Sequence, residues 1–317
     1  MERYPRDLRE FEQQFATEAD CEGYLWALRW PEGFVCRRCG NRGYWKTGNG
    51  RIICNRCRAR DSVTAGTVFQ DTHLPLTVWV RAAWWVTNQK HGISALGLKR
   101  LLGLGSYRTA WMLLQKLRIA MVRPGRDRLS GRVEVDEAYI GGIEEGVRGR
   151  QTVKKSLIVV AAQEDGKGIG RIRMARVPDA SAACLHRFVE DAVEAGSRVH
   201  TDDWPSYSGL KEKGFRHVAT PLSRRGQSAS ELLPRVHRVV SLLKRWLMGT
   251  HQGAISPEHL DGYLDEFTFR FNRRTSQHRG KLFFRLLQQT VAVDPLPYSL
   301  MNLAVRKMRA LNYHRLG

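Results

Sequence analysis

Apolar residues recur every three or four positions through much of the first 125 residues. This spacing is the period of an amphipathic helix with one face turned toward a core. It predicts helices over 11–30, 76–90, 93–102 and 107–121. The first of these helices is expected to end at Pro31, because proline cannot continue a helix.

From residue 131 onward the pattern changes to that of strands, which alternate apolar and polar residues or form short apolar runs. We predict strands over 132–140, 156–163, 170–177, 198–201 and 215–220, and helices over 181–195 and 205–213. This order indicates an α/β fold with a central mixed sheet flanked by helices. Asp136 lies in the first strand and Asp202 ends the fourth, so the two become neighbours if those strands pair.

A glycine-bearing turn at 103–106 joins two of the predicted helices, and Ser106 is well placed to cap the second. A short helix, a glycine turn and a longer helix fit a helix-turn-helix. Any small helical bundle produces the same pattern. In a helix-turn-helix, the second helix would expose three polar candidates for contact with DNA: Arg108, Gln115 and Lys116.

Four of the six cysteines form two Cys-x-x-Cys pairs, Cys36 with Cys39 and Cys54 with Cys57. Fourteen residues separate the pairs, and the turn-rich stretch 46–51 predicts a hairpin that brings them together. Two disulfides are the alternative, which the lack of an export signal at the amino terminus disfavours. Four sulfur ligands leave no open position on a tetrahedral metal, so we predict a structural zinc ribbon. Its exit strand is expected over 61–69.

Charge points to a polyanionic partner. The chain has 52 Lys plus Arg against 31 Asp plus Glu, a formal net charge of +21, and a pI near 10.3. Each phosphate that such a protein neutralises releases a condensed counterion, which favours binding to nucleic acid. Apolar stretches are short and interrupted, so we expect no membrane partner. With no signal peptide recognisable at the start, we expect a cytoplasmic location.

One acidic and two basic side chains of the second half stand at intervals that match a known kind of catalytic site. Asp202 is followed thirty-five residues later by His237, and Lys244 lies seven residues beyond, two helical turns along the same face. Two carboxylates brought together by a fold can hold the divalent metals that cut and rejoin DNA. Asp136 and Asp202 are therefore candidate metal ligands, and the resemblance described next adds His237 and Lys244 to the candidate catalytic set.

These positions resemble those of the DDE-type transposases, and more closely the bacterial insertion-sequence transposases with an amino-terminal zinc ribbon. The resemblance rests on Val-Glu-Val-Asp-Glu-x-Tyr-Ile-Gly-Gly over 133–142, Thr-Asp-x-Trp-x-x-Tyr over 201–207, and basic blocks over 243–253 and 266–274. One subgroup carries histidine at the third catalytic position with lysine seven residues later, which His237 and Lys244 match.

The resemblance implies a ribonuclease H-like catalytic core preceded by a zinc ribbon and a helix-turn-helix. It implies metal-dependent cleavage at the element's ends and strand transfer into target DNA, with Mg²⁺ or Mn²⁺ held by Asp136 and Asp202. Expected partners are double-stranded DNA, as terminal inverted repeats and target, and a second copy of the chain in at least a dimer. The expected regions are the amino-terminal helix with the ribbon (1–72), the helix-turn-helix (73–126), the catalytic domain (127–292) and a basic tail (293–317).

Alternatives remain open at several positions. Asp136 could belong to a solvated acidic strand end with Glu134 and Glu137, and Asp203 competes with Asp202. His237 could ligate a metal weakly, act as an acid or base, or be an ordinary histidine, and Glu231 could take its place. Further basic candidates for DNA contact are Lys154, Lys155, Arg245, Arg270, Arg273 and Arg274. The rival functions are a catalytically inactive, transposase-derived DNA-binding protein and a structure-selective nuclease.

Overall fold

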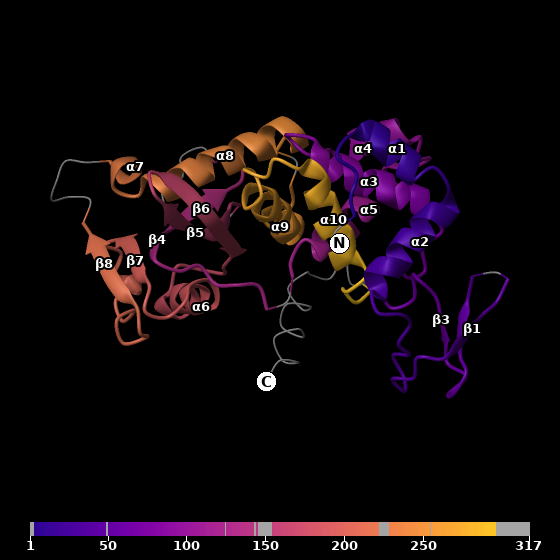
Figure 1. Ribbon diagram of the computed structural model, residues 1–317. Helices are drawn as coiled ribbons and strands as arrows, with labels where there is room; N and C mark the ends of the chain where they lie inside the picture. The colour runs from indigo at the N-terminus through magenta and orange to yellow at the C-terminus, as the bar shows by residue number, and fades with distance from the viewer. Residues whose placement is uncertain are drawn as a thin grey trace. The chain divides into compact units, whose positions relative to one another are not determined.

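The computed structural model describes residues 3–48, 50–123, 125–142, 144, 154–221, 228–253 and 255–295. The chain divides into two compact units, one formed by Met1–Arg123 with Ser276–Leu303 and the other by Pro124–Thr275 with Ala304–Gly317 (Figure 1). The predicted basic tail lies almost entirely outside the described residues, as do residues 145–153, which precede Lys154. In the described part of the chain, no helix combines the length and apolar character needed to cross a bilayer.

The first unit begins with two helices where one was predicted over 11–30. Helix α1 spans Leu8–Gln14 and α2 spans Glu18–Arg29. Thr17 separates them, because its side chain accepts a hydrogen bond from the Asp20 backbone N–H at 3.2 Å while Asp20 accepts one from the Thr17 N–H at 2.9 Å. This reciprocal capping box starts a new helix, so the prediction of a single helix was wrong.

Four more helices complete the helical part of this unit: α3 (Leu76–Asn88), α4 (Ala95–Leu102), α5 (Tyr107–Ala120) and α10 (Arg279–Thr290). Their core is aromatic, since Phe11 stacks on Trp84 at 4.7 Å between ring centroids and Phe283 contacts both edge-on. Helix α10 was predicted to belong to the catalytic domain ending at residue 292. Its apolar face instead packs against α3, so the structure groups it with the amino-terminal helices.

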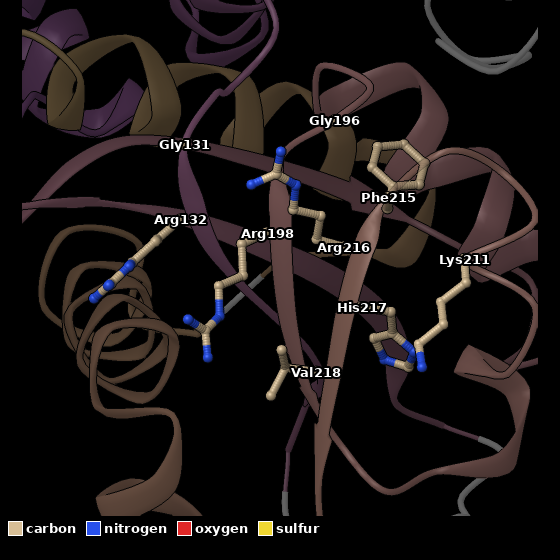
Figure 2. Close-up of a pocket in the computed structure, with 9 residues that line it drawn as sticks. All are labelled: Gly131, Arg132, Gly196, Arg198, Lys211, Phe215, Arg216, His217 and Val218. Carbon is tan, nitrogen blue, oxygen red and sulfur yellow. The ribbon is translucent and has the colours of Figure 1, made fainter.

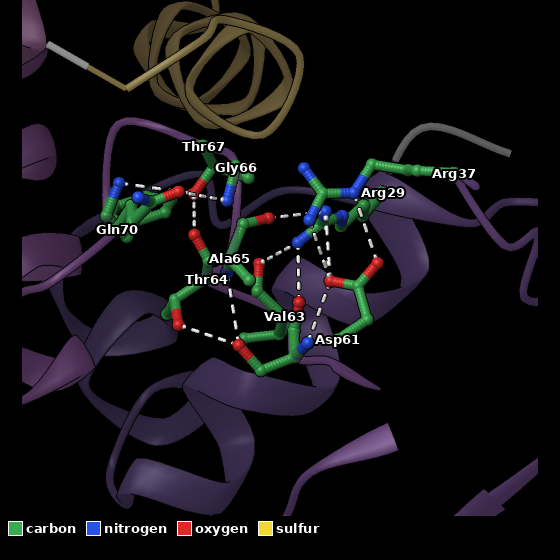
Figure 3. A network of polar contacts seen from close by, with 11 residues as sticks. Arg29, Arg37, Asp61, Val63, Thr64, Ala65, Gly66, Thr67 and Gln70 are labelled. Carbon is green, nitrogen blue, oxygen red and sulfur yellow. Dashed lines mark hydrogen bonds and ion pairs between the residues drawn. The ribbon is translucent and has the colours of Figure 1, made fainter. Parts of the chain in front are cut away.

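The ribbon is a three-stranded antiparallel sheet of β1 (Tyr44–Lys46), β2 (Ile52–Cys54) and β3 (Arg60–Asp61). The exit strand was predicted over 61–69, but β3 ends at Asp61. It ends there because the backbone carbonyl groups that follow accept hydrogen bonds from the Arg29 side chain of α2. The buried Arg29 guanidinium also pairs with Asp61 at 3.5 Å, and Arg37 pairs with the same carboxylate at 3.1 Å (Figure 3). The carbonyls that accept from Arg29 belong to Ser62, Val63 and Ala65.

The second unit contains a five-stranded mixed sheet in the order β6-β5-β4-β7-β8. Pairing is antiparallel between β6, β5 and β4, and parallel between β4, β7 and β8. The mixed sheet confirms the predicted fold class. Its strands are β4 (Arg132–Ile140), β5 (Ser156–Asp165), β6 (Gly168–Arg176), β7 (Arg198–Asp202) and β8 (Arg216–Thr220).

Helices cover the sheet on both faces (Figure 1). Helix α6 (Ala182–Ala192) packs on one face with Val133 and Val135 of β4. Helices α8 (Pro234–His251) and α9 (Leu260–Phe271) pack on the other, over Ile158 and Val160 of β5. Alternation along β4 therefore turns Glu134 and Asp136 toward the α8 side. The helix predicted over 205–213 is only a 3-10 turn, Pro205–Tyr207, and the short α7 (Ala229–Leu232) precedes α8.

Candidate active site

The parallel pairing of β4 with β7 brings the two predicted aspartates together. Glu134 pairs with His200, so Asp136 and Asp202, each two residues further on, lie beside each other on the same face. The backbone N–H of Glu137 donates to Asp136 Oδ1 at 2.8 Å, and that of Trp204 donates to Asp202 Oδ1 at 3.1 Å. Both carboxylates are held by local backbone and stay half-buried.

A third carboxylate joins this pair. Asp136, Glu137 and Asp202 each offer one oxygen, and these oxygens lie within 4.8 Å of one another. Oxygen donors at this separation fit a hard divalent cation such as Mg²⁺ or Mn²⁺. From the sequence, Glu137 is assigned only to an acidic strand end. The available signal was its position directly after Asp136 in β4.

His237 reaches the same cluster from α8. Its Nε2 lies 3.4 Å from Asp136 Oδ2, and it is a buried atom with no hydrogen-bond partner among the described residues. Burial lowers the pKa of the imidazole, an effect that the nearby Glu134 opposes and Lys244 reinforces. A neutral imidazole turned toward a carboxylate is suited to share a cation with it.

Glu134 of β4 binds the first turn of α8 and holds it against the sheet. Its carboxylate accepts the backbone N–H groups of Arg235 at 2.7 Å and Val236 at 3.0 Å, and it pairs with the Arg235 guanidinium at 2.9 Å. Free N–H groups at a helix start favour a negative partner. Because Glu134 and Asp136 share one face of β4, this contact places the next residue, His237, opposite Asp136.

Replacing Glu134 by alanine should therefore destabilise the second unit by about 2–4 kcal/mol, since two helix N–H groups and a guanidinium lose a buried anion. Urea unfolding monitored by circular dichroism measures this change. Glu164, which pairs with Arg235 at 3.3 Å from a more exposed position, supplies the matched control. Glu164→Ala should cost less than about 1 kcal/mol; equal losses in the two variants would show that Glu134 does not anchor α8.

Lys244 and Arg245 are both exposed on α8. Lys244 lies close enough to His237 for its charge to lower the histidine pKa. Glu231, the alternative to His237, caps α7: its carboxylate accepts from the Ser228 backbone N–H at 2.7 Å and from the Ser228 hydroxyl at 3.0 Å. In this structure Glu231 is thus engaged outside the carboxylate cluster.

The helix-turn-helix candidates differ in exposure. Arg108 is exposed at the start of α5. Gln115 was predicted to be exposed, but only 6% of it is, because α5 packs against α3, α4 and α10 and is covered on more than one side. Lys116 is half-buried, with its ammonium 5.9 Å from the Trp79 ring centre and 3.4 Å from the Gln70 carbonyl oxygen. Of these candidates, Arg108 is therefore accessible and Gln115 is not.

The basic candidates of the second unit are also unequally placed. Arg270 is half-buried and pairs with the buried Glu266 at 3.7 Å. Arg273 donates to the Phe269 carbonyl and lies over its ring, and Arg274 donates to the Gly170 carbonyl at 3.2 Å. These three arginines thus contribute to packing at the end of α9. Lys154 is exposed and Lys155 half-buried before β5.

The four predicted zinc ligands converge in the ribbon. Cys36 Sγ lies 3.6 Å from Cys57 Sγ, and Cys39 Sγ lies 3.6 Å from Cys54 Sγ. A tetrahedral site with Zn–S bonds of about 2.3 Å places its sulfurs about 3.8 Å apart, so these cysteines fit zinc. The Cys57 backbone N–H lowers the pKa of Cys54 to about 6, which favours the thiolate that a metal binds.

Comparison with known proteins gives two family matches. Residues 128–272 match an ISXO2-like transposase domain, and residues 16–60 match a transposase zinc-ribbon domain. Similar solved structures include a Mos1 strand transfer complex, with 16% identity over 69% of this chain and 78% of that chain and a TM-score of 0.30. A Mos1 transposase paired-end complex with the left transposon end has 12% identity over 67% and 75%, also with a TM-score of 0.30. No curated protein matches the chain.

Proposed function

Because the chain belongs to the DDE-type insertion-sequence transposases that carry a zinc ribbon, we propose that it cleaves DNA at its element's ends and joins them to target DNA. The observation that carries this proposal is the cluster of Asp136, Glu137 and Asp202, whose oxygens lie within 4.8 Å of one another. Two of these residues come from parallel strands of the matched transposase domain, which supports a site formed by the fold rather than by chance proximity.

Asp136 and Asp202, with Glu137, would hold Mg²⁺ or Mn²⁺. Such ions, when bound, stabilise charge on the reacting phosphate and activate water or a 3′-hydroxyl. The backbone N–H groups of Glu137 and Trp204 keep the two aspartates oriented for this task. Lys244, exposed on α8 near His237, would contact a DNA phosphate. The ribbon and the exposed start of α5 at Arg108 would bind the terminal repeats, with two copies of the chain joining two ends.

The test is an assay on a labelled duplex that carries the element's own terminal repeats, incubated with the full chain, Mg²⁺ and unlabelled target DNA. Strand-transfer products would support transposition. Cleavage without joining would favour a nuclease, and binding without cleavage would favour an inactive DNA-binding relative. Either of the last two outcomes would overturn the proposal.

His237 is proposed as a fourth metal-site ligand, beside Asp136, Glu137 and Asp202, since its buried Nε2 faces Asp136 Oδ2. His237→Ala should lower strand transfer about 10-fold to 100-fold or more by weakening the site. His237→Glu, which restores a ligand but not an imidazole, should recover most of the activity in Mg²⁺, because this ion prefers oxygen. Rates measured in Mg²⁺ and Mn²⁺ check this. Equal losses in both variants would instead assign His237 an acid–base role.

A further inference from the structure

We propose that three arginines on neighbouring strands, Arg132, Arg198 and Arg216, bind the phosphate backbone of the DNA that enters the active site. We call them the arginine row. The inference rests on the proposed function for the identity of its ligand, and it adds a DNA-contact surface that no basic motif in the sequence indicated. It assigns the row to phosphates, not to bases, because guanidinium groups in line suit a repeating anion.

The row follows from the strand register. Arg132 of β4 pairs with Arg198 of β7, and Arg198 pairs with Arg216 of β8. Paired residues point to the same face, and neighbouring strands lie about 4.8 Å apart, so three like charges stand side by side. Such pairs destabilise a sheet unless an anion compensates them. Arg132 contacts Glu164 at 3.7 Å, whereas Arg198 and Arg216 form no ion pair within the described part of the chain.

The row borders a hollow of about 780 Å³ at the amino-terminal ends of these strands. Figure 2 shows the side chains of the three arginines on neighbouring strands, while Lys211 and His217 lie on the other side of β8. The lining contains four Lys or Arg side chains and no acidic one. All three arginines are exposed, so their charge is available to an external anion.

The row and the carboxylate cluster lie on the same face of the sheet. Arg132 precedes Asp136 by four residues, and Arg198 precedes Asp202 by four. An even number of residues along a strand keeps the side chains on one face, and four residues separate each arginine from its aspartate by about 13 Å along the strand. That distance equals the length of about four base pairs along the axis of a DNA duplex. Helix α8 packs on β4 and β5. On β7 and β8, His200 and Val218 lie between the row and Asp202, and both are half-buried.

The experiment measures DNA affinity of the full chain by fluorescence anisotropy over a salt series, with Ca²⁺ in place of Mg²⁺ so that no cleavage is needed. The test variant is Arg198→Gln/Arg216→Gln. Its control, Arg187→Gln/Lys167→Gln, removes the same charge at two exposed positions on α6 and on the β5–β6 turn. We expect the slope of log affinity against log salt to fall by about 0.9 for each lost phosphate contact in the test variant. The control should keep the wild-type slope.

An unchanged slope in the test variant, or an equal change in the control, would overturn the arginine row. A thermal melt reports whether each variant is folded. If the double variant does not fold, the single Arg198→Gln and Arg216→Gln variants replace it, each with half the expected change. Because the titration measures binding without cleavage, its result is independent of whether the chain transfers strands.

Discussion

Asp136→Asn and Asp202→Asn should each abolish strand transfer while the protein remains folded. Each change removes a charged oxygen donor from the cluster that Asp136, Glu137 and Asp202 form within 4.8 Å. Stabilisation of phosphoryl charge by a bound cation is worth several kcal/mol, which corresponds to a loss of about 10²-fold to 10⁴-fold. The rate of strand-transfer product formation in Mg²⁺ measures the effect, and calorimetric titration with Mn²⁺ measures cation binding.

Asp203→Asn is the matched control for these two variants. Asp203 directly follows Asp202 in the chain, is exposed, and does not belong to the carboxylate cluster. Its replacement should leave strand transfer and Mn²⁺ binding near wild-type values. If Asp203→Asn lost activity while Asp202→Asn kept it, the assignment between the two neighbouring aspartates would be reversed. If all three variants kept activity, the catalytic site would lie elsewhere.

Removing zinc should unfold the ribbon. Its strands are two or three residues long, and its four cysteine sulfurs form two pairs 3.6 Å apart. Structural zinc contributes about 10–16 kcal/mol to the folding of small metal domains at neutral pH. Chelation, or Cys36→Ser, should therefore abolish zinc retention and expose the ribbon amides to rapid hydrogen exchange. Metal analysis and amide exchange measure the two effects.

Cys184→Ser provides the control, because Cys184 lies on α6 outside the cysteine cluster. It should keep full zinc content. The amides of α3 and α10 should stay protected after zinc removal, since those helices share an aromatic core of Phe11, Trp84 and Phe283 that needs no metal. Loss of protection throughout the helices would show that zinc supports the whole unit and not only the ribbon.

Local patterns predicted most of the elements correctly. The alternating run of β4 was predicted with its observed bounds, Arg132–Ile140, since one face of that strand packs under α6 and the other under α8. Ser106 caps α5 as predicted, its hydroxyl accepting from the Thr109 N–H at 3.0 Å. Such features depend on residues that are close in sequence, so periodicity and capping chemistry identify them.

Two of the errors share a cause, which is burial by distant segments. Gln115 is polar but buried, because three helices surround α5. Helix α10 follows the catalytic strands in sequence, yet its Phe283 completes a core with Phe11 of α1. A local pattern reports that a helix has an apolar face and does not report which partner covers it.

By itself the sequence determined most of the elements, the four zinc ligands, and the identity of two aspartates and one histidine that could form a site. Only the tertiary structure decided that Glu137 lies in one cluster with the aspartates and that Glu134 binds the first turn of α8. It also placed Arg132, Arg198 and Arg216 side by side on neighbouring strands. Strand register is the physical reason. A parallel pair such as β4 with β7 aligns residues more than sixty positions apart, and a shift of one residue would turn Asp202 and Arg198 to the opposite face.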